Sequence, residues 1–199
     1  MLDRDMRLFV ALDIDPSIRE RIARFLDEVR GLAPAARWVS AESLHVTLKF
    51  IGERPDAMVS EIEPAIRSVS AKAFQLSFHG TGFFPNQNSA RVFWIGIEAD
   101  TALGELAAQI ERALVPLRIE AENRAFNPHL TLARAGEGAP GRQMSDKPNR
   151  TFSALREKFG TMPAADFGTM RAADFFLYRS QISSRGSQYS KLASFTLNS

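Results

Sequence analysis

An internal repeat constrains this chain more than any other feature of its sequence. The tetrapeptide His45-Val46-Thr47-Leu48 recurs as His129-Leu130-Thr131-Leu132, 84 positions later. The same offset of 84 positions superposes Arg7-Leu8-Phe9 on Arg91-Val92-Phe93, and it aligns the apolar residues of two helical patterns. A strand, an amphipathic helix and a histidine-containing strand therefore recur in the same order and at the same spacing. We infer two related lobes, each of which contributes one His-x-Thr-Leu strand.

The other hydrophobic patterns predict that strands alternate with helices along the chain. Asp15 followed by Pro16 is a typical helix start, because aspartate favours the N-cap and proline favours the first helical turn. The predicted strands are 7–14, 44–51, 74–78, 90–98, 127–133, 174–182 and 189–197. The predicted helices are one after Asp15 and those at about 56–69, 103–114 and 153–159. Gly80, Gly82, Pro85 and residues 86–89 indicate a turn, and 134–150 indicates a loop.

Two of the three histidines occupy the repeated motif. Side chains alternate along a strand, so His45, Thr47 and Lys49 should share one face while Phe50 points the other way with the aliphatic residues. The second motif should repeat this alternation. We therefore expect each lobe to bury its aliphatic face and to present a histidine and a threonine hydroxyl on the opposite face, where the two pairs meet across a cleft.

Two opposed imidazoles suit a transfer reaction at phosphorus. The attacking oxygen must lose a proton and the leaving oxygen must gain one, and histidine, with an unperturbed pKa of ~6.5, serves either purpose near neutral pH. The threonine hydroxyls can donate hydrogen bonds to the non-bridging oxygens as negative charge develops there, so this chemistry requires no metal. Arg134, just past the second motif, can add a permanent positive charge at the same oxygens.

Other interpretations of these residues stay open. Two neutral imidazoles can bind zinc, although no acidic ligand lies at a regular spacing beside either motif. The chain has no cysteine, which excludes disulfides, thiolate metal sites and a cysteine nucleophile. Arg134 is equally compatible with a solvated strand end, and we interpret His79 as a structural histidine. Phe9 and Phe93 could stack on a base, but we expect both to be core residues.

Composition adds little about function. The length of 199 residues suits one domain or two small fused lobes. The net charge of +2, from 25 basic and 23 acidic residues, is too small to indicate nucleic-acid binding by itself. No segment approaches the ~20 apolar residues of a membrane span, and the N-terminus does not resemble a signal peptide. We expect a cytoplasmic monomer without membrane contact.

A second, shorter repeat lies further along the chain. Residues 159–166 and 167–174 are tandem octapeptides that match at seven of eight positions. Eight residues are too few for a solenoid unit, so we interpret the repeat as a local duplication without chemistry of its own. We expect the first copy to finish a short helix and form an exposed loop, and the second to lead into the next strand.

The paired motifs resemble those of the two-histidine (2H) phosphoesterase superfamily, and within it the bacterial RNA 2′,3′-cyclic phosphodiesterases, historically called 2′-5′ RNA ligases. The resemblance extends over nearly the whole chain and departs from the family pattern at the octapeptide, where one copy is expected. The matching segments are 7–11, 45–52, 82–85 and 128–134, with Ser180, Gly186 and Tyr189 near the end. It implies an α+β fold with a bilobal pseudo-twofold duplication, in which two antiparallel-rich sheets flank a central cleft and helices lie outside. Residues 1–199 would then form a single phosphoesterase domain.

The resemblance also implies a role for each motif residue. His45 would protonate the leaving oxygen, and His129 would act as proton acceptor and activate water. Thr47, Thr131 and Arg134 would bind the substrate phosphate. The implied reaction is hydrolysis of an RNA 2′,3′-cyclic phosphate to a 2′-phosphate, without metal or other cofactor. The implied partner is an RNA or oligonucleotide that carries such an end.

Two further functions are compatible with the same residues. One is a superfamily enzyme that acts on another substrate, such as a small nucleotide cyclic phosphate, or that cleaves or ligates a 2′-5′-linked oligonucleotide. The other is a non-catalytic module that binds RNA ends. Loss of a motif histidine would indicate the binding module, and both histidines are present. The sequence does not distinguish the first alternative from the cyclic phosphodiesterase.

Overall fold

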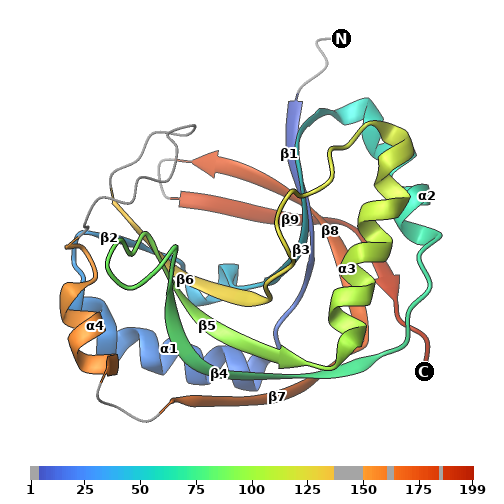
Figure 1. Cartoon of the computed structure of the whole chain (residues 1–199). Helices are drawn as coiled ribbons and strands as arrows, with labels where there is room; N and C mark the ends of the chain where they lie inside the picture. Colours follow the sequence, from blue (N-terminus) through green and yellow to red (C-terminus); the bar gives the residue numbers. More distant parts are fainter. Residues whose placement is uncertain (1–4, 137–149, 161–163, 184–185) are drawn as a thin grey trace.

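The computed structural model of the chain describes residues 5–136, 150–160, 164–183 and 186–199 (Figure 1). Its strands form a four-stranded sheet in the order β3-β1-β8-β9 and a five-stranded sheet in the order β2-β6-β5-β4-β7. All neighbouring strands pair antiparallel. The strands are β1 (Asp5–Leu12), β2 (Ala36–Trp38), β3 (Val46–Pro55), β4 (Phe74–Phe84), β5 (Val92–Ala99), β6 (His129–Ala135), β7 (Asp166–Ala172), β8 (Asp174–Ser183) and β9 (Gly186–Thr196).

Four α-helices and four short 3-10 helices connect these strands in the described residues. The α-helices are α1 (Pro16–Val29), α2 (Val59–Arg67), α3 (Thr101–Leu114) and α4 (Ser153–Gly160). The 3-10 helices are η1 (Arg30–Leu32), η2 (Ala41–Ser43), η3 (Asp56–Met58) and η4 (Val115–Leu117). In Figure 1, α2 and α3 lie on one side of the molecule and α1 and α4 on the other.

The predicted duplication is present in the fold. The order β1-α1-β3 recurs as β5-α3-β6, and β1 pairs with β3 as β5 pairs with β6. Helices α1 and α3 both have 14 residues, and each buries one apolar stripe. The buried positions include Ile18, Ile22 and Leu26 in α1 and Leu103, Leu106 and Ile110 in α3. The α+β fold with a pseudo-twofold duplication and two antiparallel sheets is therefore confirmed.

Each half of the duplication packs its helix on the sheet that holds the other half's motif. Helix α3 packs against β3, the first motif strand. Helix α1 packs against β7, which belongs to the same sheet as β6, the second motif strand. Phe25 of α1 contacts Phe93 of β5 and Phe167 of β7, with ring centroids 6.5 and 5.0 Å apart. The two halves are therefore interlocked. Neither half could bury its apolar helix stripe without the other.

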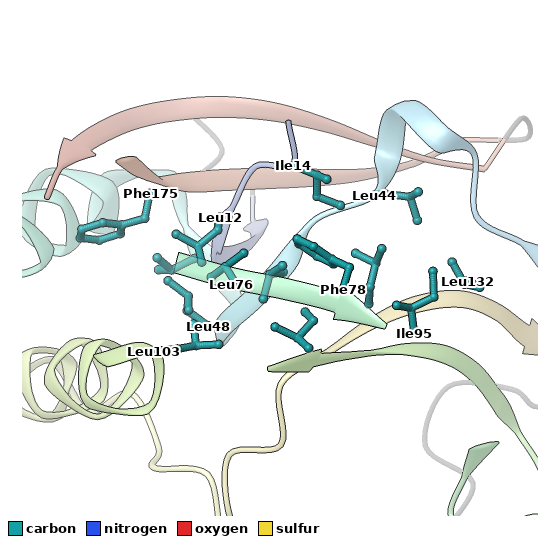
Figure 2. Close-up of a cluster of buried hydrophobic side chains, with 14 of the residues drawn as sticks. Leu12, Ile14, Leu44, Leu48, Leu76, Phe78, Ile95, Leu103, Leu132 and Phe175 are labelled. Carbon is teal, nitrogen blue, oxygen red and sulfur yellow. The ribbon is translucent and has the colours of Figure 1, made fainter. Parts of the chain in front are cut away.

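One hydrophobic core joins both sheets. Figure 2 shows side chains of the four-stranded sheet, such as Leu12 and Leu48, facing Leu76, Phe78 and Ile95 of the five-stranded sheet. All of these are buried. Full burial of a large apolar side chain contributes about 1.5–3 kcal/mol, so this shared core holds the two motif strands in a fixed relation.

Both motif strands carry a β-bulge at the same repeat position. Register shifts leave Leu48 without a direct partner on β1 and Leu132 without a direct partner on β5. A bulge adds one residue to one strand and so inverts the side-chain alternation beyond it. Consequently Lys49 is buried and Phe50 is 50% exposed. The predicted alternation of the first motif strand is therefore wrong beyond Leu48: Lys49 lies on the core side, and Phe50 on the side of His45.

Several predicted element boundaries were also wrong. Strand β3 begins at Val46, so His45 lies just before it. Gly80 and Gly82 lie within β4 rather than in a turn, and Arg134 lies within β6 rather than in a loop. The rest of that predicted loop, 137–149, falls outside the described residues. The short strands β2 and β7 carried too few residues of clear periodicity to be predicted.

The tandem octapeptide takes more part in the fold than expected. Its second copy supplies most of β7, which pairs with β4. Its first copy begins with Phe159 near the end of α4, and residues 161–163 fall outside the described residues. Phe159 and Phe167, the first residues of the two copies, both contact the ring of Phe25. The two copies therefore contribute to one hydrophobic cluster.

Candidate active site

The two motif histidines are held in the same way. Nδ1 of His45 lies 2.8 Å from the carbonyl oxygen of Ser43, and Nδ1 of His129 lies 2.8 Å from that of Asn127. A carbonyl oxygen only accepts hydrogen bonds, so each Nδ1 must carry the proton. Each Nε2 is then the nitrogen that can gain or lose a proton. The carbonyl two residues upstream is a partner that the sequence motif did not reveal.

Arg134 links the two histidines electrostatically. Burial lowers the pKa of His45 and the pKa of His129, and the nearby Arg134 guanidinium lowers both values further, against the opposing effect of the main-chain hydrogen bonds. A charge that acts on both imidazoles must lie near both. Arg134 follows the bulge at Leu132, and it corresponds in the repeat to Phe50 on the first motif strand. The Arg134 guanidinium is thus the group that lies near both motif histidines.

The threonine of each motif lies two residues after its histidine and faces a residue of the adjacent strand. Thr47 is opposite Ala11 of β1, and Thr131 is opposite Trp94 of β5. Both threonines are partly buried. Within the described part of the chain, no hydrogen-bond partner is found for either hydroxyl, so both are available to a ligand.

Aromatic side chains contact His45, and a hydrogen-bonded network of charged side chains lies next to them. Its ring centroid is 4.7 Å from that of Phe9 and 5.0 Å from that of Tyr189. The Tyr178 hydroxyl donates a 2.5 Å hydrogen bond to Asp13, which also pairs with Lys191. Tyr189, Tyr178, Asp13 and Lys191 line a hollow of about 430 Å³ beside His45. Asp13 raises the pKa of His45, although burial has the larger, opposite effect.

Arg19 fixes the segment that carries His45. Its guanidinium donates hydrogen bonds of 2.5 Å to the carbonyl of Ala41 and 3.3 Å to that of Leu44. It thereby ties α1 to η2 and to the residue just before His45. Arginine supplies several donors in a rigid plane, which suits it to such multiple contacts. Helix α1 thus positions His45, which belongs to the same half of the duplication.

His129 has different surroundings. Its ring makes an edge contact with Phe84, 4.9 Å between centroids, and Phe84 in turn contacts Trp94. The Trp94 indole lies so close over Gly82 that a β-carbon there would collide with it. No carboxylate among the described residues shifts the pKa of His129, whereas Asp13 acts on His45.

Comparison with known proteins identifies the family. The family model of the LigT-like phosphoesterases matches the chain twice, over residues 12–94 and 95–173. The chain belongs to the LigT-like phosphoesterase family. The double match agrees with the duplicated fold.

Curated relatives and solved structures agree with this assignment. An RNA 2′,3′-cyclic phosphodiesterase of Archaeoglobus fulgidus is 37% identical over 161 residues, which cover 81% of this chain and 88% of the relative. Another of that name, from Methanothermobacter thermautotrophicus, is 29% identical over 96% of this chain and 99% of its own. The structure of E. coli LigT complexed with 3′-AMP superposes with a TM-score of 0.77 at 25% identity, covering 98% of this chain and all of that one.

His79, Phe93 and Phe9 are the remaining candidate residues of this LigT-like phosphoesterase. Nε2 of His79 is 2.9 Å from a carboxylate oxygen of Glu98 on the next strand, in keeping with a structural role. Phe93 lies in the main core as expected, but Phe9 belongs to a separate cluster beneath His45. Phe9 is opposite Phe50, whereas Phe93 is opposite Ala133, the repeat equivalent of Lys49, so the two phenylalanines are not equivalent in the structure.

The described residues contain no group of three or more histidine and acidic side chains placed to hold a metal ion. None of their helices has both the length and the apolar character needed to cross a membrane.

Proposed function

We propose that this LigT-like phosphoesterase hydrolyses RNA 2′,3′-cyclic phosphate ends to 2′-phosphomonoesters by metal-independent acid–base catalysis with two histidines. The paired imidazole geometry carries this proposal: each Nδ1 is fixed by a main-chain carbonyl, and Arg134 acts on both rings. The relatives named RNA 2′,3′-cyclic phosphodiesterases support the substrate class.

The reaction needs one proton acceptor and one proton donor. Nε2 of His129 takes a proton from a water molecule while the water oxygen forms a bond to phosphorus. The bond between phosphorus and the 3′ oxygen breaks on the opposite side, and Nε2 of His45 gives its proton to that oxygen. The products are a 2′-phosphate and a free 3′ hydroxyl, and a proton transfer between the two sites through solvent restores the starting state. General acid–base steps of this kind contribute about 10²–10⁴ in rate.

The different surroundings of the two histidines support this division of roles. Burial has the largest effect on the pKa of His45 and lowers it, and Arg19 and Arg134 lower it as well, but the Asp13 carboxylate raises it and so favours the imidazolium form that a donor requires. Burial and Arg134 also lower the pKa of His129, and no carboxylate of the described residues raises it. A neutral His129 suits the acceptor.

Thr47, Thr131 and Arg134 would bind the phosphate. Each threonine hydroxyl can donate to a non-bridging oxygen, and Arg134 can donate two parallel hydrogen bonds to a pair of oxygens. These donors are in place before charge builds on the oxygens, so the transition state requires little reorganisation.

We further propose that residues 1–199 act as a single domain of two related lobes, because the helices are exchanged and the core is shared. An RNA partner, a monomeric state and a cytoplasmic location remain predictions for this chain.

Product analysis after incubation with an RNA oligonucleotide that ends in a 2′,3′-cyclic phosphate tests the proposal. A 2′-phosphate end should form, and His45→Ala and His129→Ala should not form it at a comparable rate. A 2′-5′-linked dinucleotide and a nucleoside 2′,3′-cyclic phosphate should be assayed in parallel. If the 2′-5′ linkage alone is cleaved, the substrate class proposed here is wrong.

A further inference from the structure

The chain segment that leads into the second motif has little local structure to hold it. Residues 119–128 lie between η4 and β6 and form no helix or strand, and those from 120 to 127 are all exposed. Among the described residues, no hydrogen bond between main-chain atoms involves this segment. Asn127 nevertheless carries the carbonyl that accepts a hydrogen bond from Nδ1 of His129. The position of that carbonyl must therefore be fixed by side chains.

A lysine of the first motif strand, paired with a glutamate of α3, supplies two such contacts. The Lys49 side chain is 2% exposed, and its Nζ donates hydrogen bonds of 2.7 Å to the Glu120 carbonyl and 2.8 Å to Oε1 of Glu111. The same Oε1 accepts the main-chain N–H of Glu122. Burial raises the pKa of the Glu111 carboxyl, but these two hydrogen bonds and the Lys49 charge lower it more, so the pair is ionised. Two points of the exposed segment are therefore tied to β3 and α3.

Packing alone does not explain a lysine at this position. Burying an ammonium group costs free energy even when the group is paired, and apolar replacements of a buried ion pair are often no less stable. The second half of the duplication has the buried apolar Ala133 at the position equivalent to Lys49. A buried charge is best justified where it fixes one arrangement of the chain among several. The arrangement that Lys49 fixes is that of residues 120–122.

The two halves fix the carbonyl that holds each histidine in different ways. Arg19 binds the carbonyls on both sides of the segment that contains Ser43, the acceptor for His45, and Arg19 comes from the same half. Lys49 binds the segment that contains Asn127, and it comes from the other half. The first motif strand thereby supports the second motif histidine.

We propose that Lys49 and Glu111 are positioning residues for His129. They fix residues 120–122 and through them the Asn127 carbonyl, five positions after Glu122. That carbonyl keeps the imidazole proton on Nδ1, which leaves Nε2 free to accept a proton. The role rests on the proposed function, in which His129 takes a proton from water.

Long-range 1H–15N NMR spectra of the imidazoles test the positioning role without turnover. At a pH where both rings are neutral, His45 and His129 of the wild type should each carry the proton on Nδ1. Lys49→Met and Glu111→Ala should give a mixture of the two neutral tautomers at His129 and leave His45 unchanged. Glu111→Gln keeps an oxygen that can accept both hydrogen bonds, so it should retain the Nδ1 tautomer. Arg67→Met, which breaks an exposed ion pair on α2, is the control.

Kinetics on an RNA oligonucleotide with a 2′,3′-cyclic phosphate end test the consequence for the reaction. Lys49→Met and Glu111→Ala should lower kcat by roughly 10-fold or more, because a displaced proton acceptor reacts slowly. KM should stay within a few-fold of the wild type, and Glu111→Gln should keep most of kcat. Lys49→Met added to His129→Ala should lower kcat no further, because the lysine acts through that imidazole. All rates should be measured well below the melting temperature of each variant.

Two results would overturn the positioning role. The first is a wild-type tautomer of His129 in both Lys49→Met and Glu111→Ala. The second is a further fall in kcat when Lys49→Met is added to His129→Ala. If Lys49→Met does not fold, Glu111→Ala decides, because the Glu111 side chain is 28% exposed and its loss leaves no buried cavity. A wild type that does not hydrolyse the oligonucleotide contradicts the proposed function instead, and the tautomer at His129 still decides on the positioning role.

Discussion

The two halves of this protein carry nearly the same motif, yet the motif histidines have different neighbours. His45 lies against Phe9 and Tyr189, near the Asp13 carboxylate, and a hollow opens beside it. His129 contacts Phe84 and has no acidic residue of the described chain acting on it. Duplication thus supplied two equal imidazoles with equally fixed Nδ1 protons, and the surroundings made them unequal. The difference teaches that two copies of one motif can acquire different electrostatic surroundings without a change in the motif itself.

Replacing each motif histidine should have the largest effect on activity and should show whether the two have different roles. His45→Ala and His129→Ala should each lower kcat/KM by a factor of about 10² or more. A substrate whose leaving oxygen departs without a proton should partly rescue His45→Ala and leave His129→Ala inactive, because only the donor becomes dispensable. Steady-state kinetics on both substrates measure this. Rescue of His129→Ala alone would mean that donor and acceptor are exchanged, and full activity in both variants would remove the catalytic role.

Deletion of residues 160–167 tests whether both copies of the tandem octapeptide are needed for stability. This deletion leaves a single copy, which should lower the stability by about 2 kcal/mol or more, because one of the two phenylalanines on Phe25 is lost from the core. Thermal unfolding measures the effect. A control that replaces Thr169, on the exposed side of β7, by Ser should melt close to the wild type. An unchanged melting temperature for the deletion would show that one copy is enough for packing.

Removing the Asp13 charge should make the histidines more alike. Asp13→Asn should lower the pKa of His45, since the carboxylate raises it. A donor must be protonated, so the falling limb of the pH profile should move to lower pH, and kcat/KM above that limb should drop several-fold. The rising limb, set by His129, should stay in place. Glu42→Gln neutralises another carboxylate of the same hollow and is the control. A shift of the rising limb instead would mean that His45 is the acceptor.

A β-carbon at Gly82 should disturb the His129 side alone. Gly82→Ala displaces the Trp94 indole, which supports Phe84 and through it His129. Activity should fall by a few-fold, with the falling limb of the pH profile unmoved. Gly104→Ala in α3, where no atom lies near the added carbon, is the control. An equal loss in both variants would place the effect outside the site.

The smallest expected effect is that of metal removal. If imidazoles, hydroxyls and Arg134 are sufficient, incubation with EDTA should leave kcat/KM unchanged. The assay should compare untreated protein, chelated protein, and chelated protein with added zinc or manganese. Activity lost on chelation and restored by either ion would contradict the metal-independent mechanism.

The sequence by itself determined the duplication, the two motif strands and the helices between them. These features rest on local periodicity and on a repeat of equal spacing, and both can be read without knowing which segments meet. The same signals indicated His45, His129, Thr47, Thr131 and Arg134 as candidate site residues. The family model matches the chain twice, in agreement with that duplication.

Only the tertiary structure decided how the halves interlock and what surrounds each histidine. The bulges at Leu48 and Leu132 depend on pairing with other strands, so they invert a side-chain alternation that looks regular in the sequence. Asp13 comes near His45, and Arg37 opposite Arg134, through contacts between distant segments. Such contacts depend on which surfaces pack together, and the spacing of residues along the chain does not record that choice.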